Sequence, residues 1–469
     1  MKKVIIIAIL SMFFATSCND ALDILPEDSI PAENAFTNVA DLQNGLNAIY
    51  FQYNPQNMID YSSNYTDDTK IGADNGGQKV GFHQWVLQAN SAESQNMWLN
   101  CYATINSINR VLEAASTIAP ANAAEAEQYD KILGDCYALR AYLHLEVLAH
   151  YGVGYGDSDA GVPISNFVVV FEQLPRSTAG EVFEFINNDL DTAMGLIDAS
   201  YTDNGYVTRD FITAVRARAA LYSGASSTAL TATQALMDKY PLADQGQYIN
   251  MFANDTDNTE VIFKLYRTNG NNDPRVGGVW YFTGTGGAFM EMSNGFYDAV
   301  TADPSDIRAF VNIDPLTDDA NNLHFIGKYP GKEGFDYLND VKVFRVSEMY
   351  LIRAEILAKS GDYNGAASLL KDIRDARTGG DTALSGFNNL PDAMDEILAE
   401  RRLELAYEGF RFVDVKRTRS ITNDGFDRNP ADCGGAVPCQ LASTDYRFTF
   451  PIPVAELNGN PNITQAPGY

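Results

Sequence analysis

The most charged segment of this 469-residue sequence has the look of an active site: residues 399–417 read AERRLELAYEGFRFVDVKR. Glu400, Glu404 and Glu408 recur every four residues, so they share one helical face, where like charges repel unless cations lie opposite them. Arginines in the same segment are suitable cations, because a guanidinium binds a carboxylate through two parallel hydrogen bonds. We therefore predict a structural ion-pair network rather than a catalytic cluster. Its members are Glu400, Arg401, Glu404, Glu408, Arg411, Asp414 and Arg417.

Other catalytic chemistry is poorly represented in the sequence. The four histidines form no HExxH motif, and no glycine-rich run continues into a phosphate-binding loop. With 61 acidic residues, some close carboxylate pair is inevitable, so such a pair does not identify a glycoside hydrolase. The run Asp255-Thr256-Asp257-Asn258 hints at a calcium loop but lacks the glycine and terminal glutamate of an EF-hand. We predict no catalysis and no cofactor, with calcium at residues 255–258 as a minor alternative to a solvated turn.

The N-terminus has the pattern of an export signal. Two lysines precede an apolar run that ends at Phe14, which is too short to span a bilayer, and small residues then lead to Cys18. This order resembles a bacterial lipobox, in which the cysteine is acylated and becomes the new N-terminus. We predict that residues 1–17 are removed and that lipid on Cys18 anchors residues 18–469 to a membrane. A plain signal peptide with an incidental cysteine is the alternative.

Composition excludes several classes of partner. The net charge of −28 repels phosphate backbones and anionic lipid surfaces, so nucleic-acid binding is not expected. A hydrophobic content of 45% is ample for a packed core, and the chain is longer than one compact core usually allows. We therefore expect two lobes or a repeat architecture.

Helical periodicity dominates the chain. The expected helices span residues 95–115, 124–151, 177–196, 209–222, 227–239, 344–358, 363–376 and 392–407. In two helix pairs a glycine, Gly224 or Gly361, is followed five residues later by an alanine, and the second pair matches the spacing of a tetratricopeptide repeat. The predicted fold class is all-α dominated, with tetratricopeptide-like helix pairs and long loop and short-strand insertions near residues 53–93 and 241–343. One expected strand is residues 279–282.

The cysteines suggest one local disulfide. Cys433 and Cys439 bracket CGGAVPC, a loop that brings its ends together, and an exported protein meets an oxidising environment. Cys101 and Cys136 lie in helical patterns and are predicted to be buried thiols. The absence of any CxxC motif argues against a zinc ribbon.

Five segments, in order along the chain, resemble the SusD/RagB-like outer-membrane lipoproteins of Bacteroidetes. They are the lipobox with CNDALDILPED, WLNCYATINSINRVL (98–112), LRAYLHLEVLAHYGVGYG (139–156), ERRLELAYEGFRFVDVKR (400–417) and FPIPVAELNGNPNITQAPGY (450–469). The resemblance implies a helical fold with four tetratricopeptide-like units. It also implies a lipoprotein at the cell surface that binds nutrient, usually a glycan, without catalysis and caps a SusC-like TonB-dependent transporter. CGGAVPC does not fit the family pattern.

This resemblance favours an oligosaccharide-binding lipoprotein of the outer membrane that faces the cell surface. Peptide binding on the same architecture, as RagB-like members imply, is one alternative, and a surface glycoside hydrolase is a weaker one. Sugar rings stack their C–H faces on aromatic rings and need amides or carboxylates at their hydroxyl edges. The two insertions offer that mixture. We predict ligand contacts from Tyr65, Asp68, Asn75, Trp85, Trp280, Tyr281, Phe282 and Asn294. For Trp85 and Trp280 loop packing is the alternative, whereas Trp98 is predicted to lie in the core.

Overall fold

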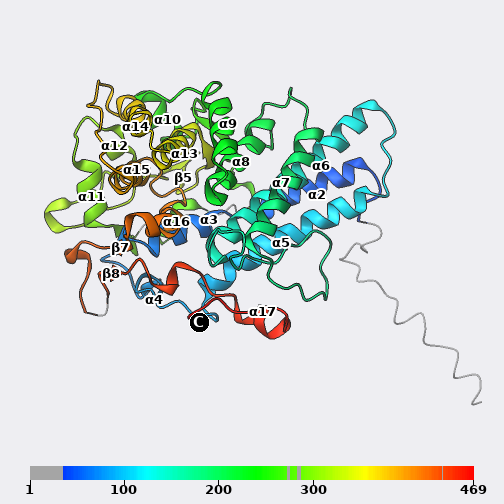
Figure 1. The fold of residues 1–469 in the computed structure, drawn as a ribbon, viewed down its shortest axis with the longest axis horizontal. Helices are drawn as coiled ribbons and strands as arrows, with labels where there is room; N and C mark the ends of the chain where they lie inside the picture. The colour runs from blue at the N-terminus through cyan, green and yellow to red at the C-terminus, as the bar shows by residue number, and fades with distance from the viewer. Residues whose placement is uncertain (1–34, 272–274, 283–286, 436) are drawn as a thin grey trace, which may run out of the picture.

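The structure is a computed structural model that describes residues 35–271, 275–282, 287–435 and 437–469 (Figure 1). The predicted signal peptide and Cys18 lie outside these residues. The α-helices are α2 (Val39–Gln52), α3 (Gln56–Asn64), α4 (Val80–His83), α5 (Ala92–Ala115), α6 (Ala123–Tyr151), α7 (Ala179–Leu196), α8 (Arg209–Ser223), α9 (Ser226–Met237), α10 (Gln245–Ala253), α11 (Asn294–Thr301), α12 (Ile307–Asn312), α13 (Val346–Lys359), α14 (Tyr363–Thr378), α15 (Leu390–Glu404), α16 (Arg411–Thr422) and α17 (Val454–Gly459). None of the described helices combines the length and apolar character needed to cross a membrane.

Short strands and 3₁₀ turns complete the secondary structure of the described residues. The strands are β1 (Thr69–Ile71), β2 (Val261–Leu265), β3 (Met290–Met292), β4 (Gly331–Lys332), β5 (Phe335–Asp336), β6 (Val341–Arg345), β7 (Phe426–Asp427) and β8 (Gln440–Leu441). The 3₁₀ turns are Asn269–Asn271, Val276–Val279, Asp319–Asn321, Pro430–Asp432 and Tyr446–Phe448. The predicted helix-dominated fold class is confirmed.

Local capping moves some helix ends relative to the sequence predictions. α7 begins at Ala179, two residues after the start of the expected range, because Thr178 is the N-cap and forms a reciprocal capping box with Glu181. α15 begins at Leu390 because the Asn389 side chain accepts a hydrogen bond from the Asp392 backbone N–H.

The helix pairs form one continuous stack although the sequence separates them. α7 packs on α8, α9 packs on α13, and α13 packs on α15, so α9 and α13 are neighbours despite the long insertion between them. Figure 1 shows α2, α5, α6 and α7 side by side in one part of the molecule and α13, α14 and α15 together in another. Gly224 and Gly361 turn the chain between paired helices with φ of +77° and +87°, a region that glycine enters without strain. The insertions are therefore excursions from a repeat-like scaffold.

The described strands form four two-stranded antiparallel sheets. β2 pairs with β6, so both ends of the second insertion meet at the scaffold. β1 pairs with β3, with Lys70 opposite Glu291, and this sheet joins the first insertion to the second. The expected strand at residues 279–282 is wrong: a 3₁₀ turn ends at Val279, and only an isolated bridge from Tyr281 to Ala288 follows.

The C-terminal segment covers the first insertion. Figure 1 shows the chain from β7 to α17 running along one edge of the molecule, past α4 and beneath α3 and α16. Phe450 lies within 6.3 Å, centroid to centroid, of the Phe82 ring and within 5.3 Å of the Tyr65 ring. The first insertion thus has a wall on the side that would otherwise face solvent.

Candidate ligand-binding site

The predicted aromatic contacts of the first insertion lie in the core. Tyr65 is 0% exposed, and its hydroxyl donates to the Arg447 carbonyl at 3.1 Å. Trp85 is 1% exposed; its indole N–H donates to the Tyr65 carbonyl at 2.6 Å, and the Arg428 guanidinium lies 4.0 Å from its ring centre. Direct ligand contact by these two rings is therefore wrong for this structure, and loop packing is the role that the burial supports.

The predicted polar contacts of the first insertion are already engaged. Asp68 is buried and accepts a hydrogen bond from Arg402 Nε at 2.7 Å. Asn75 donates through Nδ2 to the Phe289 carbonyl at 2.7 Å, so it joins the two insertions. Both side chains are internal, which argues against a ligand contact in this conformation.

The second insertion repeats the pattern with one exception. Trp280 donates its indole N–H to Ser63 Oγ at 3.0 Å, and Tyr281 stacks on Tyr337 with ring centres 4.6 Å apart. Asn294 is 8% exposed and accepts from the Lys70 ammonium at 3.1 Å. Phe282 alone among the eight predicted residues is partly exposed, against Phe289. Burial thus removes seven of the eight from the accessible surface.

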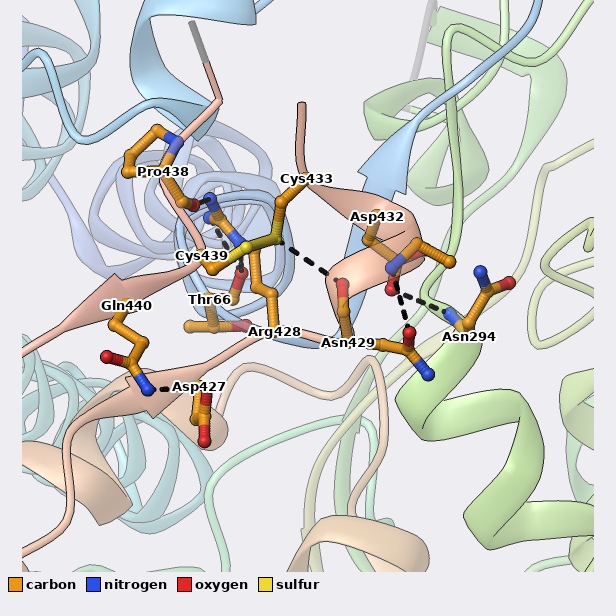
Figure 2. Close-up of a disulfide and its surroundings, with 11 residues drawn as sticks. Thr66, Asn294, Asp427, Arg428, Asn429, Asp432, Cys433, Pro438, Cys439 and Gln440 are labelled. Carbon is orange, nitrogen blue, oxygen red and sulfur yellow. Dashed lines mark hydrogen bonds between the residues drawn. A yellow bond between two sulfur atoms is a disulfide. The ribbon is translucent and has the colours of Figure 1, made fainter. Parts of the chain in front are cut away.

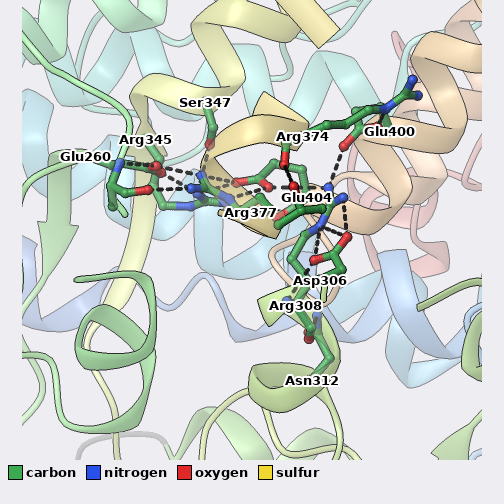
Figure 3. A network of polar contacts seen from close by, with 12 residues as sticks. Glu260, Asp306, Arg308, Asn312, Arg345, Ser347, Arg374, Arg377, Glu400 and Glu404 are labelled. Atoms are coloured by element: carbon green, nitrogen blue, oxygen red, sulfur yellow. Dashed lines mark hydrogen bonds and ion pairs between the residues drawn. The ribbon is translucent and has the colours of Figure 1, made fainter. Parts of the chain in front are cut away.

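The charged segment lies in a buried network of ion pairs (Figure 3). Two of its carboxylates, Glu404 and Glu408, pair with an arginine from elsewhere in the chain, Arg345. Glu404 is 0% exposed and accepts from Arg345 and Arg377, each at 2.8 Å. Burial raises the pKa of Glu404, but Arg377 and Arg345 outweigh burial and hold that pKa far below its ordinary value. All seven predicted members form ion pairs: Glu400–Arg308, Arg401–Asp414, Glu404–Arg377, Glu408–Arg345, Arg411–Asp67 and Arg417–Asp414.

A disulfide closes the loop between β7 and β8 (Figure 2). Cys433 and Cys439 are bonded, whereas Cys101 and Cys136 are buried free thiols. Arg428, at the start of this loop, donates to the Thr66 carbonyl and to the Pro438 carbonyl.

The other side of the same loop reaches the second insertion. Asp432 Oδ2 accepts from the Asn294 backbone N–H at 2.9 Å, at the first turn of α11. Because Arg428 holds Thr66 in the first insertion, the disulfide-closed loop contacts both insertions and fixes them relative to each other.

Asp255, which the calcium alternative needs as a ligand, is already paired with lysines. Asp255 pairs with Lys342 and, at 3.3 Å, with Lys332, and it also accepts from the Asp340 backbone N–H. Asp257 accepts from the Thr259 backbone N–H in a turn. Across the residues that the structure describes, no group of histidine, cysteine and carboxylate side chains has a metal-binding arrangement.

A pocket of about 600 Å³ opens within the second insertion, and we name it the insertion pocket. It is lined by Ile249, Phe252, Ala253, Tyr297, Ala309, Phe310, Val311, Ile313, Asp314, Pro315, Thr317, Gly327 and Pro330. The Phe310 ring is 68% exposed at its edge. Ligand sites typically enclose 300–1,000 Å³ with mainly apolar walls and a few fixed polar groups, so this pocket is a candidate ligand site.

The buried network positions the exposed ring of the insertion pocket. In α12 the Arg308 side chain is 2% exposed and bonds to Asp306 and, at 2.5 Å, to Glu400 on α15. Phe310 lies two residues further along the same short helix, on a different face from Arg308, and it lines the pocket. The ion pairs therefore fix how the helix presents its ring.

Polar groups of the insertion pocket are held by local hydrogen bonds. Asp314 Oδ1 accepts from the Leu316 backbone N–H at 2.8 Å, and Thr317 Oγ1 accepts from the Phe325 backbone N–H at 3.0 Å. Gly327 passes close behind, where an added Cβ would lie 2.8 Å from the Asp314 nitrogen. Sequence reasoning located the insertion but missed these residues, because a six-residue helix gives no periodic signal.

Comparison with known proteins identifies the class. A family model described as "SusD family" matches residues 195–469, and another described as "Starch-binding associating with outer membrane" matches residues 20–222. The first match alone spans more than half of the sequence, so the chain belongs to the SusD family. The resemblance drawn from the ordered sequence motifs is confirmed.

Curated relatives and solved structures agree with this assignment. SusD-like protein P38 of Formosa agariphila is 24% identical, over 87% of this chain and 90% of the relative, and SusD-like protein P2 of the same organism is 23% identical over the full length of both. A SusD superfamily protein from Bacteroides thetaiotaomicron matches with a TM-score of 0.79 and 24% identity, covering 92% of this chain and all of that chain. A laminarin binding SusD-like protein matches with a TM-score of 0.71 and 20% identity, again over 92% of this chain and all of the other. At these identities the structural matches show the fold.

Proposed function

We propose that this protein is a cell-surface lipoprotein that binds oligosaccharide in the insertion pocket and delivers it to a SusC-like TonB-dependent transporter of the outer membrane. The observation that carries the proposal is the insertion pocket itself, which is lined by both the exposed ring of Phe310 and the locally held carboxylate of Asp314. Membership of the SusD family and the laminarin-binding structural neighbour support a glycan as ligand.

The pocket supplies both kinds of contact that a sugar needs. The Phe310 and Tyr297 rings offer apolar faces for C–H groups, and the second carboxylate oxygen of Asp314 offers an acceptor for hydroxyl groups. Thr317 adds a hydroxyl on the same wall. Phe282 lies outside this pocket, and we retain it as a secondary contact, since its ring is partly exposed.

Peptide is the second candidate ligand, because much of the pocket wall is aliphatic. Ile249, Val311 and Ile313 line it together with two prolines, and such walls suit an apolar side chain as well as a sugar face. A peptide would also explain why few polar groups converge there.

Anchoring and delivery form the second half of the proposal. Lipid on Cys18 would hold the protein at the outer membrane, in keeping with the description "associating with outer membrane" of the matching family model. Binding without bond cleavage is the expected activity, so incubation with a bound oligosaccharide should return the sugar unchanged by chromatography.

Calorimetry with the purified protein tests the ligand. Titration with neutral oligosaccharides and with a tryptic peptide mixture should give saturable heat for a sugar, and Phe310→Ala should lower that affinity about tenfold. Phe51→Ala is the matched control, because that ring is 51% exposed on α2, away from the pocket. Heat from peptides alone would reject the glycan in favour of the second candidate.

Co-purification tests the partner. Affinity capture of the lipidated protein from detergent-solubilised outer membrane should bring down a large TonB-dependent transporter in stoichiometric amount. Capture that repeatedly yields the lipoprotein without such a transporter would reject delivery, whatever the calorimetry shows.

A further inference from the structure

A second cavity, of about 300 Å³, lies far along the chain from the insertion pocket, against the first helices of the scaffold. It is lined by Gln43, Leu46, Lys131, Asp135, Tyr201, Asp203, Tyr206 and Val207. These residues come from α2, α6 and the turn between α7 and α8, and none of them lines the insertion pocket. We name it the tyrosine pocket.

The floor of the tyrosine pocket is a fixed polar pair. Asp135 is 1% exposed; it pairs with the Lys131 ammonium and accepts from the Tyr50 hydroxyl at 2.9 Å. Burial raises the pKa of Asp135 to about 6, whereas the Lys131 ammonium and the Tyr50 hydroxyl favour its ionised form. The ammonium also lies 5.2 Å from the centre of the Tyr201 ring. The two charges offset each other, so the floor favours a neutral ligand.

The rim of the tyrosine pocket presents an exposed aromatic ring. Tyr206 is 43% exposed, and Tyr50 contacts it edge to face with ring centres 5.4 Å apart. The turn that carries Tyr206 is rigidly built: Gly205 N–H donates to Asp203 Oδ1 at 2.9 Å, and Asn204 Nδ2 donates to the Val261 carbonyl at 3.1 Å. An added Cβ at Gly205 would lie only 1.9 Å from the Tyr266 ring, so any larger residue here would have to displace that ring. The ring is held in place before any ligand arrives.

We propose that the tyrosine pocket is a second saccharide-binding site, which takes one neutral sugar unit of a longer chain. The Tyr201 and Tyr206 rings provide surfaces for the C–H faces of the sugar. The Asp203 carboxylate and the Gln43 amide provide partners for hydroxyl groups at its edge. This inference rests on the proposed function for the class of ligand, but not for the place where it binds.

The presence of two sites on one protein alters the binding of long glycans. A chain that reaches both sites meets the second at a raised effective concentration, so its overall affinity exceeds that of either site. A short oligosaccharide that fills only one site gains nothing from the other. The proposal therefore predicts a chain-length dependence that a single pocket does not produce.

Stoichiometry measured by calorimetry tests the proposal. The probes are neutral hexaoses built of glucose, xylose, mannose or galactose, titrated into the full purified chain. We expect two equivalents of one hexaose per chain, with one of the two sites weakened about tenfold by Tyr206→Ala and the other weakened about tenfold by Phe310→Ala. Phe171→Ala, which truncates a ring that is 91% exposed elsewhere, should leave two. Tyr206 is half exposed, so its truncation should leave the fold intact, as an unchanged circular dichroism spectrum would verify.

The outcomes separate the two proposals. One equivalent in the unchanged chain that only Phe310→Ala weakens overturns the tyrosine pocket and leaves the insertion pocket standing. One equivalent that only Tyr206→Ala weakens supports the tyrosine pocket and overturns the insertion pocket as the glycan site. No heat from any hexaose overturns both.

Discussion

The two insertions have similar compositions but differ in how much of their aromatic surface the fold leaves exposed. The first, residues 53–93, buries its aromatic rings and pairs Asp67 and Asp68 with arginines, so that apart from Val86 mainly polar turn residues face solvent. The second, residues 241–343, buries Trp280 as deeply but leaves Phe310 exposed beside a pocket of about 600 Å³. The difference arises from what covers each insertion. The C-terminal segment packs over the first, whereas the second forms its own wall. Aromatic content therefore does not identify a binding surface until it is known which other segments pack over those rings.

Trp85→Ala gives the largest expected loss and tests the covered side of the comparison. The indole is 1% exposed and lies beneath Arg428, so its removal leaves a cavity and should cost about 4 kcal/mol in the free energy of unfolding. Urea denaturation measures this cost. The folded variant should keep its saccharide affinity. A stable variant that loses binding would show that the first insertion contacts the ligand after all.

Asp67→Asn tests the ion pairs beneath the first insertion and should cost about 3 kcal/mol at pH 7, because two guanidiniums lose a buried partner. Burial raises the pKa of Asp67, but Arg402 and Arg411 outweigh burial and hold that pKa well below its ordinary value. A depressed pKa stabilises the fold above the unfolded-state value of about 3.9, and this contribution is lost as pH falls below it. Denaturation from pH 6 to pH 2 should therefore show a shallower loss in the variant. Equal slopes would contradict this assignment.

Arg308→Met links the buried network to the open insertion. Loss of the guanidinium leaves Glu400 and Asp306 without one of their cations, at an expected cost of about 3 kcal/mol. Because the same helix carries Phe310, saccharide affinity should also fall. Arg216→Met is the matched control, since its partner Asp191 has a side chain that is 67% exposed and such pairs contribute less than about 1 kcal/mol. Unchanged affinity in the Arg308 variant would separate the network from the pocket.

Cys433→Ala with Cys439→Ala tests the loop that contacts both insertions. Closing a seven-residue loop lowers the conformational entropy of the unfolded chain, which stabilises the fold by about 2 kcal/mol. The double variant should therefore lose that much in the free energy of unfolding. Dithiothreitol should lower the stability of the unchanged chain by a similar amount and leave the variant unaffected. A reductant effect of equal size on both proteins would assign the loss to another group.

Phe310→Ala has the smallest expected effect on stability and sharpens the comparison from the open side. The ring is 68% exposed, so its truncation should change the free energy of unfolding by less than about 0.5 kcal/mol while saccharide affinity falls. Phe296→Ala, in the same insertion but 0% exposed, should cost about 3 kcal/mol. Similar costs for both variants would mean that the exposed ring is packed in solution.

Local signals account for what could be predicted from the sequence. The helices followed from apolar spacing, the paired helices from Gly224 and Gly361, and the disulfide from a short loop between two cysteines. The ion pairs of the charged segment could be predicted, because a helix with glutamates every fourth residue needs cations nearby. Family membership followed from the order of motifs along the whole chain. Apart from family membership, each of these inferences depends on residues close together in sequence.

Tertiary structure alone decided which side chains are accessible. Arg411 pairs with Asp67 across 344 residues, and Arg308 meets Glu400 across 92, and no local spacing predicts such contacts. The residues next to Trp85 in the sequence are as polar as those expected around an exposed, ligand-binding ring, yet the distant C-terminal segment covers it. Exposure depends on the packing of remote segments, and so the sequence determined the class and scaffold of this protein while only the fold placed its pockets.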